Sequence, residues 1–489
     1  MRWKTTVVLL IATIGIGAYL SLYEIRQPTR EEHARLANQV VRVSAEDTTQ
    51  LVLDLPNVKA TLTRQGTTWR INPQQLRANP VLVNKLLGAL DPLMANRILL
   101  GSSDHPLDPK SYGLDPAVGW MSVVSPAGPT TLLIGETTPV AGNRYVQIKG
   151  RPEIFIVSAR LFDDANQVPE QFRDPLLLRF DAWQADGLSV SATGRSLTLA
   201  RTPRGWQIAS TGPTGPGPQS NPDQPWSDVA DRTEVNSLLQ HIARVSIARF
   251  LEETPQVEQV AAYGFDQPRA EVTLRRKDAS SVTVFFGKPL PDNHSLLYAK
   301  RSDEPALYAV SNADIEALVR DPHGLRSKPC FDFFTNEVSK LEVVWEGARW
   351  MMERAEGRWK TEGAAGPLDE ARVEEFLNDV VDLRLGGFVD DAPKDLVRYG
   401  LEPPKGALTV WTVADTPPQR LLVGSTIEPS TNRYGRIDGR AAIVRLPETI
   451  TEVLAKTLDS LSAPAPSKTQ PALHPIGTGT SPPPAAPSK

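Results

Sequence analysis

Histidine and cysteine are the side chains that most often bind transition metals or act as catalytic bases and nucleophiles. The chain has six histidines and one cysteine. No two histidines stand four residues apart, as two ligands on one helix face would, and a single thiol forms neither an intrachain disulfide nor a thiolate cluster. We therefore predict no metal-binding residues and expect Cys330 to be a small buried apolar side chain. The histidines are His33, His105, His241, His294, His323 and His474.

The segment GSSDHP, residues 101–106, contains the three residue types of a hydrolytic triad. Triad members come together from distant parts of a chain, whereas neighbouring residues point in different directions. We interpret this segment as a polar loop. The sequence also has no GxxxxGK[ST] and no strand-linked GxGxxG, so it shows no recognisable cradle for a nucleotide. We predict no catalytic and no cofactor-binding residues.

Three adjacent pairs of acids could in principle support general acid–base chemistry: Asp163 with Asp164, Glu252 with Glu253, and Asp390 with Asp391. They fall in or beside expected loops, and solvated surface is their usual setting. The triplet Asn-Arg-Tyr occurs at residues 143–145 and 432–434, but the corresponding place before Tyr298 has two leucines. We interpret it as the start of a strand in which the tyrosine matters.

Length and charge narrow the class of protein further. A chain of 489 residues exceeds what one hydrophobic core holds, which predicts several domains. The formal net charge is −4, with 53 basic and 57 acidic residues, so no basic surplus is available for nucleic-acid phosphates.

One short word recurs in the chain and defines its organisation. SYGLD, AYGFD and RYGLE start at residues 111, 262 and 398. The glycine permits a positive φ, which predicts a turn, and the exchange of Asp for Glu argues against a catalytic acid. Upstream of each word an arginine stands five residues before a tryptophan with a glycine between them, which predicts a β-hairpin in which the two side chains face each other. These pairs are Arg64 and Trp69, Arg201 and Trp206, and Arg354 and Trp359.

An amphipathic helix is expected between each hairpin and its Tyr-Gly word, because apolar residues recur at i, i+3, i+4 and i+7. The predicted buried faces are Val83, Leu86, Leu87 and Leu90; Val235, Leu238, Leu239 and Ile242; and Val373, Phe376, Leu377 and Val380.

An apolar residue followed by glycine comes after each word, and a tyrosine follows ten or eleven residues later. The glycines are Gly135, Gly287 and Gly424, and the tyrosines are Tyr145, Tyr298 and Tyr434. The order of features is the same three times, so we predict three tandem copies of one domain. Phe180-Asp181 and Phe331-Asp332 open the second and third copies.

The ends of the chain differ from the repeats. Residues 5–23 are uncharged and apolar and, as a helix, span about 28 Å, which predicts a transmembrane anchor. A short basic tail before an anchor usually stays in the cytoplasm, so we expect the rest of the chain to be extracytoplasmic. The predicted segments are a cytoplasmic tail, 1–4; the anchor, 5–23; a linker, 24–44; repeat domains at 45–179, 180–330 and 331–461, the second with a flexible insertion at 210–226; and a disordered tail rich in Pro, Ala and Ser, 462–489.

The hairpin, the helix, the YG[LF][DE] turn and the apolar-Gly strand together resemble the uncharacterised bacterial family known as domain of unknown function 4340 (DUF4340), from Ala45 to about Leu461. The first copy departs slightly, because Pro116 follows its acid directly and Ala117 comes next. The resemblance implies a membrane anchor followed by tandem domains, similar in arrangement to auxiliary components of gliding-motility-type ABC transporters. It carries over no site residues, because none is established for the family.

We therefore expect an α+β fold: an N-terminal transmembrane helix followed by three homologous domains, each a mainly antiparallel sheet with a packed amphipathic helix. The expected function is that of a non-enzymatic scaffold or auxiliary subunit of the inner membrane and envelope, without cofactors. Its expected partners are envelope proteins, possible ABC transporter subunits among them, and no nucleic acid. The alternative is an extracytoplasmic glycan- or peptide-binding module, and an enzyme comes third.

Overall fold

The computed structural model describes Trp3, Thr13 and residues 38–462 with gaps at 42, 103–104, 193–194, 204, 212–224, 256–260, 319–320, 363–366 and 414–416. The predicted cytoplasmic tail apart from Trp3, most of the linker, most of the 210–226 insertion and nearly all of the C-terminal tail lie outside the described residues. The structure therefore concerns the three predicted repeats.

The prediction of a membrane anchor is corrected. Residues 5–23 lie outside the described residues except for Thr13, and no described helix is long and apolar enough to cross a membrane. The long helices of the described part have 11 to 13 residues, against about 20 for a membrane span. The structure thus gives no support to the predicted single-pass inner-membrane location with an extracytoplasmic body.

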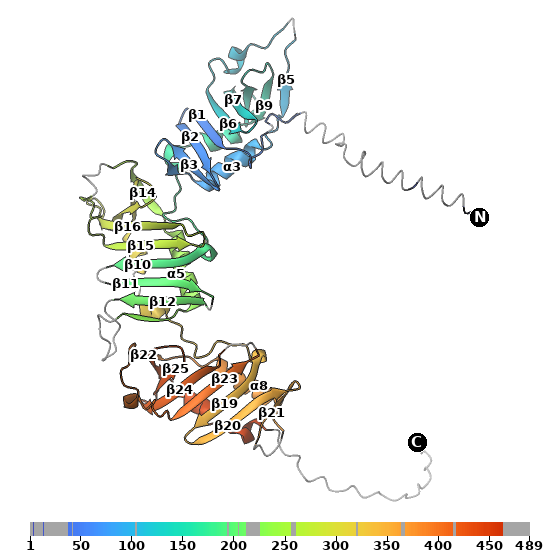
Figure 1. Ribbon diagram of the computed structural model, residues 1–489. Coiled ribbons are helices and arrows are strands. Elements are labelled where there is room, and N and C mark those ends of the chain that lie inside the picture. Colours follow the sequence, from blue (N-terminus) through green and yellow to red (C-terminus); the bar gives the residue numbers. More distant parts are fainter. Residues whose placement is uncertain are drawn as a thin grey trace, which may run out of the picture. The chain divides into compact units, whose positions relative to one another are not determined.

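The first repeat is an antiparallel sheet of nine strands in the order β4-β3-β2-β1-β6-β7-β8-β9-β5 (Figure 1). Two runs of neighbouring strands meet in the middle, where β1 pairs with β6. The strands are β1 (Gln50–Leu55), β2 (Val58–Gln65), β3 (Thr68–Asn72), β4 (Leu76–Arg77), β5 (Arg97–Leu99), β6 (Gly119–Ser125), β7 (Gly128–Thr137), β8 (Asn143–Ile148) and β9 (Ile154–Ser158).

The second repeat has the same topology, β13-β12-β11-β10-β15-β16-β17-β18-β14. Its strands are β10 (Ala185–Ala192), β11 (Arg195–Thr202), β12 (Gly205–Thr211), β13 (Trp226–Val229), β14 (Ile247–Glu252), β15 (Ala270–Arg276), β16 (Ser281–Pro289), β17 (Leu296–Arg301) and β18 (Leu307–Ser311).

The third repeat has eight described strands in the order β21-β20-β19-β23-β24-β25-β26-β22. They are β19 (Val338–Trp345), β20 (Ala348–Ala355), β21 (Arg358–Lys360), β22 (Gly387–Asp390), β23 (Gly406–Thr412), β24 (Gln419–Thr426), β25 (Arg433–Ile437) and β26 (Ile443–Leu446). The same order in all three sheets supports the predicted triplication.

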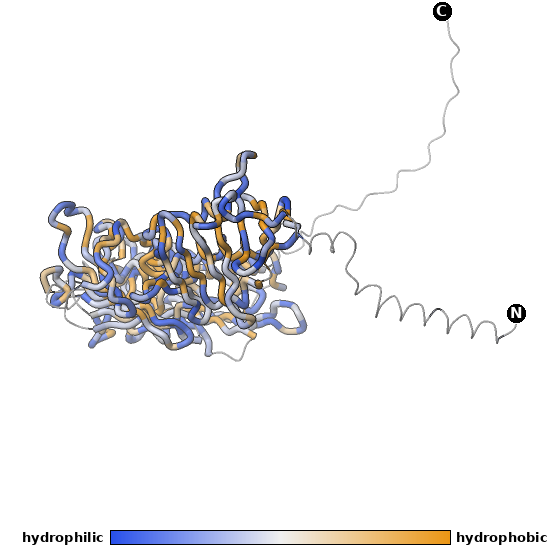
Figure 2. The backbone as a smooth tube through the Cα atoms, turned by 90° about the horizontal axis from the view of Figure 1, so that it is seen from above, coloured by the Kyte–Doolittle hydropathy of each residue, from blue (hydrophilic) through white to orange (hydrophobic). Residues whose placement is uncertain are grey.

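One helix packs on each sheet, and its buried face is the predicted one. The helices are α3 (Pro80–Leu90), α5 (Arg232–Arg244) and α8 (Glu370–Val381), and all twelve predicted residues are buried. The side chain of Asn79 caps α3 by accepting from the backbone N–H of Val81 and Leu82, and Asp369 caps α8 in the same way. These helices and the inner sheet faces form the core. Hydrophobic and hydrophilic residues are interspersed along the tube in Figure 2.

The predicted fold class, α+β, is wrong, because the fold is mostly β. The three long helices were predicted correctly, but the other helices of the described residues are short, and eight or nine described strands accompany each long helix. The short helices are α4 (Arg160–Ala165), α7 (Asn312–Leu318), α9 (Thr449–Leu454) and α10 (Leu458–Leu461), with 3₁₀ turns η2 (Pro109–Tyr112), η3 (Pro169–Phe172), η4 (Ala182–Gln184), η5 (Pro322–Leu325), η6 (Thr335–Glu337) and η7 (Val397–Tyr399).

The predicted hairpin geometry is confirmed in the outer repeats, where Arg64 lies directly opposite Trp69 and Arg354 opposite Trp359. The guanidinium carbons of Arg201 and Arg354 lie 4.9 and 5.6 Å from the centres of the rings of Trp206 and Trp359. Arg64 instead donates to the backbone carbonyls of Glu46 and Gly66. These pairs stabilise the fold.

The chain divides into two compact units. The first comprises residues 1–206 and 232–324, and the second comprises residues 207–231 and 325–489. The first unit thus contains the first repeat and most of the second, whereas the second unit joins most of β12 and all of β13 to the third repeat.

Candidate functional site

The residues first considered for chemistry do not converge. In the described part of the chain, no group of three His, Cys, Asp or Glu side chains could hold a metal ion. Ser102 and His105 exchange backbone hydrogen bonds in a tight loop, and Ser103 and Asp104 lie outside the described residues. Cys330 is buried, as predicted, and burial raises the pKa of its thiol to about 12.

The Asn-Arg-Tyr triplets open strands, as predicted. Asn143 begins β8 and Arg433 begins β25. The arginine also has a structural role that the sequence did not indicate: Arg144 donates to the carbonyl of Gly135 at 2.8 Å, and Arg433 donates to that of Gly424 at 3.3 Å. The triplet is therefore part of the repeat's framework.

The three recurring words of each repeat meet at one place. The glycine of the Tyr-Gly word has a positive φ in every copy: 67° at Gly113, 84° at Gly264 and 64° at Gly400. The glycine of the later apolar-Gly word packs on the backbone carbonyl of the tyrosine in the Tyr-Gly word. A Cβ on Gly135, Gly287 or Gly424 would lie 2.1 to 2.3 Å from that oxygen. The positive φ requires the first glycine, and this close approach requires the second.

The recurring tyrosines pack against each other. The ring centres are 4.9 Å apart for Tyr112 and Tyr145, 4.6 Å for Tyr263 and Tyr298, and 5.1 Å for Tyr399 and Tyr434. The hydroxyl of Tyr399 donates to Asp390 at 2.6 Å, and burial together with this carboxylate raises the pKa of Tyr399. The words that revealed the repeats thus form one aromatic corner in each.

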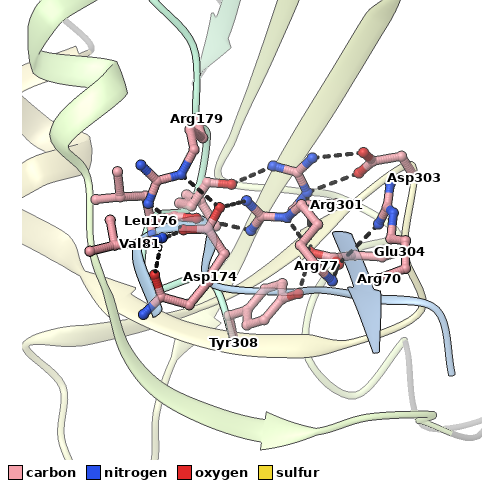
Figure 3. A network of polar contacts seen from close by, with 12 residues as sticks. Arg70, Arg77, Val81, Asp174, Leu176, Arg179, Arg301, Asp303, Glu304 and Tyr308 are labelled. Atoms are coloured by element: carbon pink, nitrogen blue, oxygen red, sulfur yellow. Dashed lines mark hydrogen bonds and ion pairs between the residues drawn. The ribbon is translucent and has the colours of Figure 1, made fainter. Parts of the chain in front are cut away.

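The largest described polar cluster lies in the first unit, where the first repeat meets the second (Figure 3). On one side its residues come from β3 and β4 of the first sheet and from the segment that connects the first sheet to the second. On the other side they come from the end of β17 and the start of β18. We call it the first junction and define it as Arg70, Arg77, Asp174, Arg179, Arg301, Asp303, Glu304 and Tyr308.

Glu304 is the centre of the first junction, and its side chain is fully buried. Its Oε1 lies 3.1 Å from Nε of Arg77 and 3.2 Å from Nε of Arg301, and the Tyr308 hydroxyl also donates to it. Arg77 reaches Asp174 through Nη1 at 2.9 Å. Each buried charge therefore has an opposite charge beside it, as burial in a low-dielectric interior requires.

The pKa values follow from this arrangement. Burial alone would lower the pKa of Arg77, but the carboxylates of Glu304 and Asp174 raise it above its ordinary value. Burial raises the pKa of Tyr308, and the charge of Glu304 raises it further. Both groups therefore keep their protons at neutral pH.

A second junction lies within the second unit and consists of Asp228, Arg326, Asp391 and Arg440. The Asp228 carboxylate is 1% exposed and accepts from Nη2 of Arg326 at 2.6 Å and from Nε and Nη2 of Arg440 at 2.7 and 2.8 Å. Arg326 also pairs with Asp391 at 2.5 Å and lies over the ring of Phe388 at 3.5 Å.

Arg326 of the second junction has an equivalent, Arg173, that stands next to Asp174 of the first junction. Arg173 bridges to Ala78 as Arg326 bridges to Ala230, which makes the two arginines equivalent. Arg173 likewise lies over a ring of the next repeat, Phe250, at 4.2 Å, but its carboxylate contact, with Glu253, is longer, at 3.9 Å. The third repeat has Ser462 at this position, bridged to Leu368.

The charge at one pair of positions is reversed between the junctions. Arg301 and Ile437 are equivalent, because they pair with the equivalent strand residues Val284 and Leu421. Glu304 and Arg440 each stand three residues later, so they are equivalent as well. Glu304 accepts from an arginine of the preceding repeat, whereas Arg440 donates to an aspartate.

The acidic pairs were only partly interpreted correctly. Asp391 is partly buried against Arg326, and Asp390 binds the hydroxyl of Tyr399, so this pair is not solvated surface. Asp163 and Asp164 lie in α4, where Asp164 pairs with the exposed Lys85. A sequence signal for the junctions existed: Arg173 and Arg326 each stand shortly before the Phe-Asp pair that opens the next repeat.

Comparison with solved structures gives matches of low sequence identity. A protein described as a DNA polymerase III beta subunit from Eubacterium rectale is 8% identical over 83% of this chain and 92% of its own, with a TM-score of 0.17. The DNA polymerase III subunit beta from Pseudomonas aeruginosa is 8% identical over 84% and 94%, with a TM-score of 0.16. Scores this low carry no argument about fold or function. No curated protein matches the sequence.

The sequence profile described as "Domain of unknown function (DUF4340)" matches three stretches, residues 69–230, 222–392 and 359–472. The matches follow one another along the chain and together cover most of it, in agreement with the three repeats of the structure.

Proposed function

We propose that this chain, which belongs to the DUF4340 family, is a non-enzymatic scaffold or auxiliary subunit that binds other proteins. An ABC-type transport or gliding-motility-like system is the partner system that we propose. The observation that carries the proposal is the use of buried charge: the two junctions hold successive repeat segments to one another within each unit.

The energetics favour an architectural role for these charges. Removing one partner of a buried ion pair typically destabilises a protein by about 3–5 kcal/mol, whereas an exposed pair contributes about 1 kcal/mol or less. The side chains of Glu304, Asp228 and Arg326 are at most 1% exposed, so each belongs to a buried ion pair whose disruption is costly. Buried ion pairs fix one arrangement of neighbouring segments. A surface that binds protein partners needs such a fixed arrangement.

A glycan- or peptide-binding module is the second candidate, and the tyrosine pairs favour it. Tyr112, Tyr145, Tyr263 and Tyr298 are half-buried, so each pair keeps part of its rings at the surface. Partly exposed aromatic rings are common in sites that bind sugars and peptides.

Cross-linking in the native cell tests the proposal. The full chain would carry an affinity tag and be expressed at its natural level, and cross-linked neighbours would be identified by mass spectrometry against an untagged control. We expect the same few proteins in each replicate, with transporter subunits or envelope components among them. Recovery of no protein above the control, together with saturable binding of the purified chain to a glycan or peptide library, would favour the second candidate.

A further inference from the structure

Each repeat has a leading edge, which in the second and third repeats receives the segment before it. We define the leading edge as the edge strand β5, β14 or β22, the residue that follows it, and the residue three positions after β8, β17 or β25. In the second repeat these elements contain the ring under Arg173 and the carboxylate that binds Arg77. In the third repeat they contain the ring under Arg326 and the arginine that binds Asp228.

Strand pairing establishes which residues of the first repeat are equivalent. Leu99 pairs with Ile154 as Asp390 pairs with Ile443, and the next residue is Leu100 in the first repeat and Asp391 in the third. The second repeat has Glu253 there, after Glu252 paired with Leu307. The acid that receives the junction arginine is thus replaced by an apolar residue in the first repeat.

The basic position is retained in the first repeat. Ile148 pairs with Leu132 as Ile437 pairs with Leu421, which makes Arg151 equivalent to Arg440. Arg440 binds both oxygens of Asp228, whereas Arg151 is exposed, as is Arg97 on β5. Leu100 is 73% exposed. The leading edge of the first repeat therefore carries two exposed arginines and an exposed apolar side chain.

We infer that the leading edge of the first repeat is a docking surface for an extended acidic segment of another protein. A carboxylate of that segment pairs with Arg151 as Asp228 pairs with Arg440, and an apolar side chain covers Leu100. This inference rests on the proposed scaffold function and names the surface and the chemistry of its partner.

A second copy of this chain is a poor occupant on chemical grounds. The end of the third repeat has Ser462 where the other repeats have the junction arginine, and the sequence from 463 to 489 contains no Asp or Glu. Leu368 is equivalent to Ala230, so the third repeat has Gly366 at the sequence position of Asp228 and offers no carboxylate there for Arg151. Charge complementarity selects a partner with an acidic extended segment instead.

A peptide that copies residues 225–231, PWSDVAD, provides a defined probe because it contains the Asp228 strand. Its binding to the purified full chain would be measured by fluorescence anisotropy. We expect saturable binding that weakens at least tenfold when the peptide carries Asn in place of Asp228, or when the protein carries Arg151→Glu. Arg358→Glu makes the same charge change at an exposed arginine of the third repeat and is expected to leave binding unchanged.

A photo-reactive residue at position 100 tests the surface in the native cell. We expect cross-links to acidic segments of another protein that are lost in Arg151→Glu. Cross-links only to residues 24–37 of the same chain, or peptide binding that Arg151→Glu leaves unchanged, would overturn the inference. In that case cross-linking of the full chain would still recover its partner proteins. Failure of this surface is thereby distinguished from failure of the scaffold proposal, which would leave no partner proteins above the control.

Discussion

Replacement of Asp228 by Asn tests the claim that the second junction stabilises the second unit. The two side chains have nearly the same shape, so the change removes a charge and leaves a hydrogen-bonding group. In the protein, Asp228 lies 2.6 Å from Arg326 and 2.7 Å from Arg440, and its side chain is 1% exposed. Its neutralisation leaves two largely buried guanidinium groups with Asp391 as the remaining acid of the junction.

The expected loss is about 3–5 kcal/mol of unfolding free energy, the usual result of removing one partner of a buried pair. For a unit of this size we expect the thermal midpoint to fall by roughly 10 °C. Differential scanning calorimetry of the full chain would follow the midpoint. Hydrogen exchange in residues 226–231 and 325–331 would show that the loss starts at the junction.

Glu356→Gln is the matched control, because Glu356 pairs with Lys360 on the surface, where the side chains are 87% and 57% exposed. It is expected to cost about 1 kcal/mol or less. If Asp228→Asn costs no more than this control, or if faster exchange is spread evenly over the third repeat, the junction does not stabilise the unit in the way described.

Three further changes test other parts of the fold. Gly424→Ala should destabilise the third repeat by about 1–3 kcal/mol in urea unfolding, because its Cβ would lie 2.2 Å from the carbonyl of Tyr399. The control is Gly88→Ala, in open space on α3, which should stabilise the protein by up to about 1 kcal/mol. Equal effects of the two substitutions would contradict the close approach at Gly424. Leu238→Ala, at a position with no exposed surface in α5, should cost about 2–5 kcal/mol by thermal unfolding, and a loss below 1 kcal/mol would argue against its place in the core. Cys330 has its pKa raised to about 12, so the folded thiol stays protonated while the unfolded thiol ionises from about pH 8.5, and stability should fall as the pH rises above that value. Cys330→Ala should remove this part of the pH dependence, and native Cys330 that reacts quickly with a thiol reagent at pH 8 would contradict its burial.

Local patterns predicted the repeats because their determinants are local. A positive φ at Gly400 needs glycine, and four apolar residues spaced as in Val373 to Val380 need a helix with one buried face. These features survive divergence, so they were visible three times. The fold class was mispredicted because strands such as β4 and β21 are two and three residues long, too short to show a period.

The junctions could not be predicted because their partners are far apart in the chain. Arg77 and Glu304 are separated by 227 residues, and Asp228 and Arg440 by 212. An isolated arginine or acid is most often on the surface, and only the fold shows which are buried together. The prediction of solvated acids failed at Asp391 for this reason.

The reversed polarity of the two junctions has a consequence for how this chain reaches its native arrangement. Tandem domains of one family can associate in the wrong order during folding. If the end of the first repeat met the leading edge of the third, Arg77 would face Arg440 in place of Glu304, and like charges would repel as they left water. The opposite charges of Glu304 and Arg440 at one equivalent position therefore disfavour association of a repeat with the wrong neighbour.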